Sequence, residues 1–206
     1  YGIASPNTIT LNNTGSGSIY ALSIRQNAYG LSSGSMNITN SGSGSIYGQT
    51  GLGLAYGVYS LGDISIENSG SGSIYGDTQI GNAYGLYSIG EAIVNNIGNG
   101  KIYGKTSNGY AYGILSYGGL TLENSQNSEI KANAENSYFS AAIKINSGTN
   151  IIKNYGLIES NSLDNSRGIL IDGATISALE NNEFANIIAK SSQYGGTAIY
   201  LSLIHI

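Results

Sequence analysis

Carboxylates are the side chains of this chain that could carry acid–base chemistry. Asp63 and Glu91 lie about 28 residues apart, and Glu67 and Glu123 are separated by about twice that interval. Acid–base cleavage of a polysaccharide needs two or three carboxylates, usually with a lysine or arginine, that converge on one groove. The sequence offers no basic partner near these acids, so we expect solvated faces. We predict no catalytic residue, no metal site and no cofactor.

Tyrosine gives the second chemical signal, with 17 residues against two phenylalanines. Six tyrosines directly follow an aliphatic residue in a short extended run, so strand alternation points them outward: Tyr20, Tyr47, Tyr59, Tyr75, Tyr87 and Tyr103. Cross-strand stacking would explain this column, and so would contact with a glycan, a host surface or a sister molecule. We favour packing, and the two roles are compatible. Beyond Tyr103 the same positions hold Lys131, Glu159 and Ile188.

A tandem repeat must position these side chains. Ala-Tyr-Gly begins at Ala28, Ala55, Ala83 and Ala111, and each repeat of about 28 residues contains three short runs separated by Gly, Ser, Asn and Asp. The run that starts at residue 63 alternates apolar and polar residues, as a strand does. Stacked repeats of this kind predict an all-β, right-handed parallel β-helix (β-solenoid) with three strands per coil and about seven coils. A β-sandwich does not explain the return of one residue type at a fixed interval.

The repeat also predicts the core. One aliphatic column per run should face inward: Leu31, Val58, Leu86, Ile114, Ile143, Ile169 and Ile199 in the first run; Ile38, Ile66, Val94, Leu122 and Ile152 in the second; and Ile19, Ile46, Ile74, Ile102, Ile130, Ile158 and Ile187 in the third. Four tyrosines share the parity of the first column and are expected to cap a corner of the interior: Tyr29, Tyr56, Tyr84 and Tyr112.

Asparagine returns at the end of the second run. The repeated positions are Asn40, Asn68, Asn96 and Asn124, with Asn12 before them and Asn154 after them. Asparagine tolerates the left-handed backbone of a tight turn, and stacked side-chain amides hydrogen-bond along the coil axis. We therefore predict a structural asparagine row and not a row of ligands for a polar molecule.

Composition excludes several classes of protein. The chain has no cysteine, which rules out disulfides, zinc thiolates and a cysteine nucleophile. Eight basic residues against 12 acidic ones, without a basic cluster, argue against nucleic-acid binding. No apolar stretch is long enough for a membrane-spanning helix.

The two ends of the sequence carry their own expectations. The repeat pattern is already in progress at Tyr1, so we expect residues 1–200 to be a β-helix segment of a longer protein, whose uncovered coil edges would favour self-association. Residues 201–206, Leu-Ser-Leu-Ile-His-Ile, match the translation of a transposase adapter used in DNA sequencing libraries. We interpret them as a read-through artefact, which gives His205 no functional role.

The segment from Ile64 to Tyr87, ISIENSGSGSIYGDTQIGNAYGLY, resembles the passenger-domain repeats of bacterial autotransporter adhesins (type V secretion). The resemblance implies a secreted β-helix exposed on the outer membrane of a Gram-negative bacterium and exported by a C-terminal outer-membrane β-barrel. It implies a non-enzymatic stalk or adhesive segment that contacts host surface, glycan or sister cells. Two alternatives stay open: a carbohydrate-active lyase or hydrolase whose groove lies outside this chain, and a phage tail-spike-like repeat.

Overall fold

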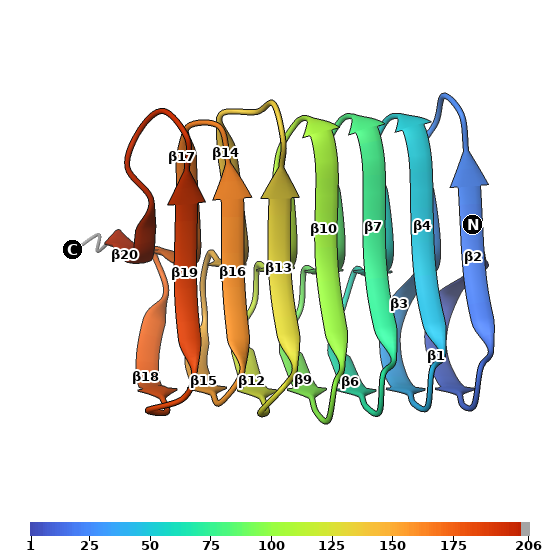
Figure 1. Cartoon of the computed structure of the whole chain (residues 1–206). Helices are drawn as coiled ribbons and strands as arrows, with labels where there is room; N and C mark the ends of the chain where they lie inside the picture. The colour runs from blue at the N-terminus through green and yellow to red at the C-terminus, as the bar shows by residue number, and fades with distance from the viewer. Residues whose placement is uncertain (203–206) are drawn as a thin grey trace.

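The computed structural model describes residues 1–202, which form 20 β-strands and no helix. The strands stack as seven three-sided coils, followed by one further strand (Figure 1). All strand pairs are parallel. The prediction of an all-β parallel β-helix with a repeat of about 28 residues is confirmed. Within these residues no helix exists that could cross a lipid bilayer.

Each side of the solenoid collects one strand from each coil. The first side contains β5 (Ala55–Ser60), β8 (Ala83–Ser88), β11 (Ala111–Ser116), β14 (Phe139–Ile145), β17 (Asn165–Asp172) and β20 (Thr197–Ser202). The second contains β6 (Ile64–Asn68), β9 (Ala92–Asn96), β12 (Leu120–Asn124), β15 (Thr149–Asn154) and β18 (Thr175–Asn181). Two long strands, β1 (Ile3–Asn13) and β3 (Ala28–Asn40), run through both sides and join them into one 13-stranded sheet.

The third side is a separate seven-stranded sheet, seen in front in Figure 1. It contains β2 (Ser18–Ser23), β4 (Ser45–Leu52), β7 (Ser73–Ile80), β10 (Lys101–Asn108), β13 (Glu129–Ala134), β16 (Leu157–Ser162) and β19 (Asn186–Ser191). The register of this sheet pairs equivalent residues of successive repeats, so that Ile46 pairs with Ile74 and Ile74 with Ile102. The sequence repeat is therefore also the spatial repeat.

The predicted aliphatic columns form the core. Leu31, Val58, Ile74 and their equivalents through Ile169 are buried in one continuous cluster, except that Ile19 in the first coil is only partly buried and packs against it, as does the predicted Ile187 in the seventh coil. Ile199 was predicted to belong to the same core and does not, since 38% of it is exposed. Its strand, β20, pairs only with β17 among the described residues, so one side of Ile199 lacks a stacked neighbour. β20 extends over Leu201 and Ser202, whereas the other four residues of the segment 201–206, His205 included, lie outside the described residues.

A row of asparagines, buried in all but its last member, Asn181, follows the second side. Each side-chain Nδ2 donates to the Oδ1 of the asparagine in the next coil at 2.7–2.8 Å, through Asn13, Asn40, Asn68, Asn96, Asn124, Asn154 and Asn181. The Nδ2 of Asn68 also donates to the carbonyl of Gly72 at 3.1 Å. Asn12, predicted as the first member, is exposed, and Asn13 takes its place because the first coil is one residue shorter in this interval.

The other two corners hold polar rows that the sequence analysis missed. Thr50, Thr78 and Thr106 are buried and donate to carbonyls of the preceding coil, with Thr106 reaching Gly81 at 2.9 Å. Buried serines line the remaining corner, and Ser60 donates to the carbonyl of Gly62 at 2.9 Å. The threonine row gives way to Ala134, and the next member, Ser162, is a buried hydroxyl without a hydrogen-bond partner.

We expect Asn68→Ala to destabilise the protein strongly. The substitution leaves the Nδ2 of Asn40 and the Oδ1 of Asn96 without their axial partners, and each unpaired buried group costs about 1–3 kcal/mol. Urea denaturation should therefore show a loss of about 2–5 kcal/mol in the free energy of unfolding. The matched control is Glu67→Ala, at the exposed neighbouring position. Equal stability of the two variants would contradict a structural role for the row.

Candidate functional site

The outer face of the seven-stranded sheet carries a row of tyrosines along the solenoid axis. The ring centroids of Tyr20 and Tyr47 lie 5.1 Å apart with nearly parallel planes, and those of Tyr47 and Tyr75 are also 5.1 Å apart. Tyr103 turns its ring edge-on to Tyr75, with centroids 5.5 Å apart. Since stacked rings cover one another, the middle of the row presents ring edges and hydroxyl groups to the solvent.

The hydroxyl groups of this row are themselves held by neighbours. The Tyr20 hydroxyl donates to Gln49 Oε1 at 2.5 Å, and the Tyr47 hydroxyl donates to Asp77 Oδ2 at 3.1 Å. Burial, with the charge of Asp77 adding to it, raises the pKa of Tyr47. The same causes raise the pKa of Tyr75 to about 12. These phenols therefore stay protonated throughout the physiological range, and the Tyr47 hydroxyl keeps its hydrogen bond to Asp77.

A shallow, open depression borders the tyrosine row. It is lined mainly by polar side chains with a few aliphatic ones: Leu22, Ser23, Ile24, Gln49, Thr50, Asp77, Thr78, Gln79, Lys105 and Ser107. Exposed aliphatic side chains continue from it onto the adjoining corner, where Leu52 pairs in register with Ile80. Leu22 and Ile24 are among the most exposed aliphatic residues, at 65% and 77%. The first four coils thus present a mixed polar and apolar surface.

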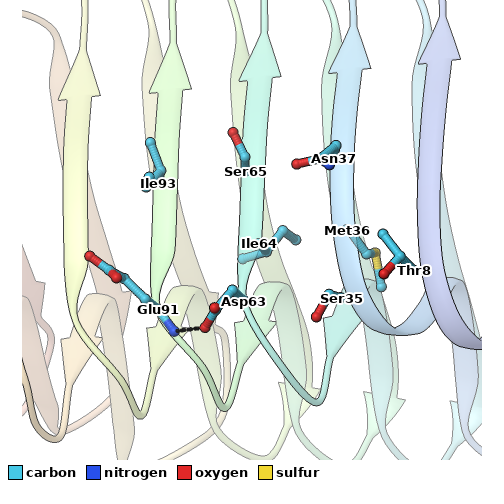
Figure 2. A pocket seen from close by; sticks show the side chains of 9 residues that line it. All are labelled: Thr8, Ser35, Met36, Asn37, Asp63, Ile64, Ser65, Glu91 and Ile93. Atoms are coloured by element: carbon cyan, nitrogen blue, oxygen red, sulfur yellow. Dashed lines mark hydrogen bonds between the residues drawn. The ribbon is translucent and has the colours of Figure 1, made fainter.

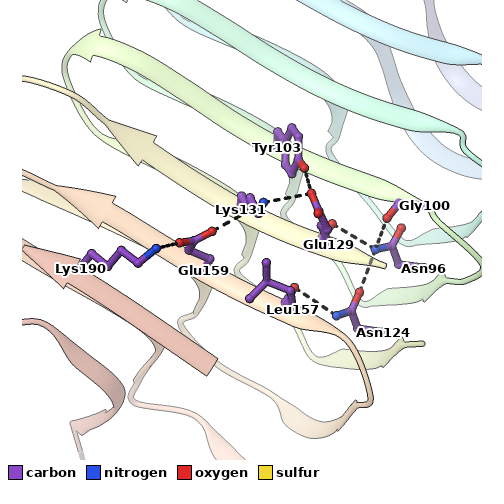
Figure 3. A network of polar contacts seen from close by, with 9 residues as sticks. All are labelled: Asn96, Gly100, Tyr103, Asn124, Glu129, Lys131, Leu157, Glu159 and Lys190. Atoms are coloured by element: carbon purple, nitrogen blue, oxygen red, sulfur yellow. Dashed lines mark hydrogen bonds and ion pairs between the residues drawn. The ribbon is translucent and has the colours of Figure 1, made fainter. Parts of the chain in front are cut away.

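Beyond Tyr103 the row continues as charged residues (Figure 3). Lys131 lies between two carboxylates, with its Nζ 3.1 Å from Glu129 and 3.6 Å from Glu159. Glu159 also pairs with Lys190, and Glu129 accepts a hydrogen bond from the Tyr103 hydroxyl. Burial alone would raise the pKa of Glu159, but the hydrogen bond and charge of Lys190, together with Lys131, lower it overall.

The sequence analysis did not detect this convergence of acids and bases. The acids singled out from the sequence lie on the second side, whereas Lys131 and its partners lie on the third. Glu159 lies one repeat after Lys131, so the two residues pair in register, and Glu129 lies two positions before Lys131 on the same face of its strand. Both relations can be read from the sequence. Every charge in the network has a partner of opposite sign, and the depression described above is lined by other residues.

The tyrosines predicted to cap a corner of the interior, Tyr29, Tyr56, Tyr84 and Tyr112, pack elsewhere, with Tyr29 only partly buried. Tyr56, Tyr84 and Tyr112 are buried, but they pack in a cluster separate from the aliphatic core. In that cluster Tyr56 stacks on Tyr84 at 4.8 Å and meets Tyr59 edge-on at 5.0 Å. Tyr59 and Tyr87, predicted to face outward, lie on the same outer side as this cluster and are partly buried against it.

Gly57 explains the error. A Cβ atom at Gly57 would lie 2.9 Å from Ile74 Cγ2, so this position faces the interior, and so does Val58 next to it. Two successive inward positions break strict strand alternation, which places Tyr56 and Tyr59 on the same outer side. Strict alternation of inward and outward positions through Gly57 therefore predicts the wrong face for Tyr56 and its equivalents.

The acids Asp63 and Glu91 lie on the second side, at an open depression shared with Thr8, Ser35, Asn37, Ser65 and Ile93 (Figure 2). Asp63 Oδ1 accepts a hydrogen bond from the backbone N–H of Glu91 at 2.9 Å, and the Glu91 carboxylate points away from Asp63. Glu67 and Glu123 stand in one column with Asn95 between them. The structure therefore does not bring the four acids together.

Within residues 1–202 no group of three or more His, Cys, Asp or Glu side chains could hold a metal ion. Comparison with known proteins gives no match to a family model, to a curated protein or to a solved structure.

We expect the tyrosines to titrate in two stages. Folding raises the pKa of several phenols, Tyr47, Tyr56, Tyr75 and Tyr112 among them, chiefly through burial. Their stabilising contribution is complete below the unfolded pKa of about 10 and is lost as the pH rises above it, because the unfolded chain releases protons that the folded chain keeps. Tyrosinate absorbance should show one reversible phase and a second that coincides with loss of the β-sheet circular dichroism signal. A single phase with an unchanged β-sheet signal would contradict the burial.

Proposed function

We propose that this chain is a non-enzymatic segment of a secreted bacterial autotransporter passenger, exposed at the surface of a Gram-negative cell. It would serve there as a stalk with a contact surface for host structures, glycans or sister cells. The observation that carries the proposal is the tyrosine row with its bordering depression, set on the outside of a regular solenoid. The resemblance of residues 64–87 to adhesin passenger repeats supports the same assignment.

The stalk role follows from the way the coils stack. Every strand from β4 to β16 pairs in parallel with an equivalent strand on both sides, and the aliphatic core runs on without interruption. Such an array has no internal hinge, and each added coil lengthens it by about 4.8 Å, the spacing of paired strands. A longer chain therefore forms a longer solenoid of the same cross-section.

The contact role rests on the mixture of side chains that this surface displays, some of which also bond to one another: Lys105 pairs with Glu135, and the Tyr20 and Tyr47 hydroxyl groups donate to Gln49 and Asp77. Near the tyrosine row the amide of Gln79, the ammonium of Lys105 and the exposed side chains of Leu22 and Ile24 lie on one surface. Stacked ring edges and hydroxyl groups complete it. This mixture suits hydrogen bonding to a polyhydroxylated glycan or to exposed protein backbone more than stacking of a sugar on a ring face, because neighbouring rings cover the faces of Tyr47.

A hydroxyl-deletion experiment tests the contact role. In the variant Tyr20→Phe/Tyr47→Phe/Tyr75→Phe the rings can still stack, but the row loses three of its four phenolic hydroxyl groups. We expect beads coated with this variant to lose at least about tenfold in retention on host cells, immobilised glycans or beads coated with the same chain, since several hydrogen bonds of about 1 kcal/mol are removed.

The matched control removes three hydroxyl groups from the buried stack, Tyr56→Phe/Tyr84→Phe/Tyr112→Phe. It should keep both its β-sheet signal and its retention. Equal retention of the two triple variants on every surface would remove the contact role from the proposal, while a loss of β-sheet signal in the first variant would reassign the row to packing.

A carbohydrate-active enzyme is the second candidate, and one observation favours it. Glu129 and Glu159 converge on Lys131, which is the combination of acids and a base that cleavage of a polysaccharide requires. Against it, Glu159 is held in its charged form by two lysines, which disfavours a general acid. The phage tail-spike-like alternative shares the coil, and no feature of the outer faces favours it over the stalk.

A further inference from the structure

Tyr20 and Tyr47 form a stacked pair on the outer face of the seven-stranded sheet. We propose that this pair is a site of oxidative dityrosine formation, which joins the first two coils covalently. The proposal does not depend on the function proposed above. It rests on three features of the pair: ring geometry, a carboxylate that can take up a proton, and the scarcity of competing oxidisable side chains.

The ring geometry brings two phenols together without a covering element. The ring centroids are 5.1 Å apart, the planes differ by 6°, and β2 and β4 pair Tyr20 directly with Tyr47. Tyr20 is 49% exposed, so one face of the pair is open to an oxidant. Both side chains point outward from the sheet and can shift to bring their ortho carbons together, which tyrosines packed on all sides cannot do.

A proton acceptor is already in place for Tyr47. Its hydroxyl donates to Asp77 Oδ2 at 3.1 Å. Removal of an electron makes a phenol strongly acidic, so loss of the electron is easiest where a carboxylate within hydrogen-bond reach can receive the proton. Tyr20 donates to the amide oxygen of Gln49, a much weaker base, which leaves Tyr47 as the first site of oxidation.

The other tyrosines near a carboxylate or in a stack lack one of these features. Tyr103 also donates to a carboxylate, Glu129, but Lys131 pairs with that carboxylate and its ammonium lies 5.7 Å from the Tyr103 ring, which disfavours loss of an electron. Tyr56 and Tyr84 stack well but are buried, at 5% and 7% exposed.

Tyr47 also stacks on Tyr75 at 5.1 Å, but their planes differ by 29° and the Tyr75 ring meets Tyr103 on its other side. Tyr1 stacks on Tyr29 at 4.9 Å, but the Tyr29 hydroxyl accepts a hydrogen bond from the amide of Asn27, which cannot take up a proton. These differences distinguish Tyr20 and Tyr47 from the neighbouring pairs.

Few other side chains compete for an oxidant. The chain has no cysteine and no tryptophan, and its one methionine, Met36, is 2% exposed. The thiols and thioethers that usually absorb oxidising equivalents are therefore absent or shielded. Tyrosine, at 17 residues, is the main oxidisable side chain on the surface.

The reaction is a two-electron, two-proton oxidation. Each phenol gives up one electron and its hydroxyl proton to become a phenoxyl radical; the proton of Tyr47 passes first to Asp77, and that of Tyr20 passes to water. The two radicals form a carbon–carbon bond between ortho carbons, and each ring then moves its ortho hydrogen to oxygen and regains a phenol. Hydrogen peroxide, acting through a haem peroxidase, is the oxidant, and it is reduced to two waters by the two electrons and two protons.

The test is peroxidase treatment of the full chain with hydrogen peroxide, isolation of the monomer by gel filtration, and digestion with trypsin. Cleavage after Arg25 separates Tyr20 from Tyr47, so their coupling links peptide 1–25 to peptide 26–101 with the loss of two hydrogen atoms. Fragment spectra assign the linked residues, and dityrosine fluorescence gives the yield. We expect Tyr20–Tyr47 to be the main cross-link.

Three variants decide the outcome. Tyr47→Phe should abolish this cross-link, and Asp77→Asn, which keeps a hydrogen-bond acceptor but removes the base, should lower its yield by at least about tenfold. Glu91→Gln, which removes a carboxylate on another side of the solenoid, should leave the yield unchanged. The proposal is overturned if Asp77→Asn couples as well as the parent chain, or if the most exposed tyrosines, Tyr1, Tyr138 and Tyr194, supply the main cross-links.

Discussion

The structure depends on one constraint: each coil must stack its side chains directly on those of the coil beneath it, with like on like in the asparagine row and the aliphatic core. Parallel pairing sets the separation at about 4.8 Å, which suits an amide donating to an amide, an isoleucine on an isoleucine and a tyrosine on a tyrosine. The asparagine row shows the constraint in its strictest form, because each buried amide is both donor and acceptor along the axis. Replacement of one member affects the two coils beside it.

The interior and the exterior respond differently as the repeat loses regularity after Asn124. The asparagine row continues to Asn181 and the aliphatic core to Ile171, although the spacing between successive asparagines varies. On the outer face the tyrosine row is replaced by Lys131 and Glu159, which bond to their neighbours as ion pairs. The interior rows therefore continue while the surface chemistry of this face changes, from aromatic in the first four coils to charged in the later ones.

Side-chain repetition was sufficient to predict the fold, since only stacked coils return Ile46, Ile74 and Ile102 to one column. It was insufficient where the backbone departs from strict alternation. Gly57 adds an inward position and sends Tyr56 to the outer cluster, and a short first coil moves the asparagine row from Asn12 to Asn13. The ion pairs around Lys131 were missed because pairing between coils depends on register as well as residue type. The covered faces of the stacked rings depend on side-chain rotation, which no sequence pattern encodes.

Hydrogen exchange read coil by coil, by mass spectrometry of peptides from the intact protein, tests most directly whether axial stacking holds the molecule together. The account predicts the slowest exchange in the strands β6, β9 and β12, each of which ends at a fully buried asparagine. Faster exchange is expected in β18, where the register shifts and most side chains are exposed. Uniformly fast exchange, or protection in β18 equal to that in β9, would contradict it, because stability would then not follow the stacked rows.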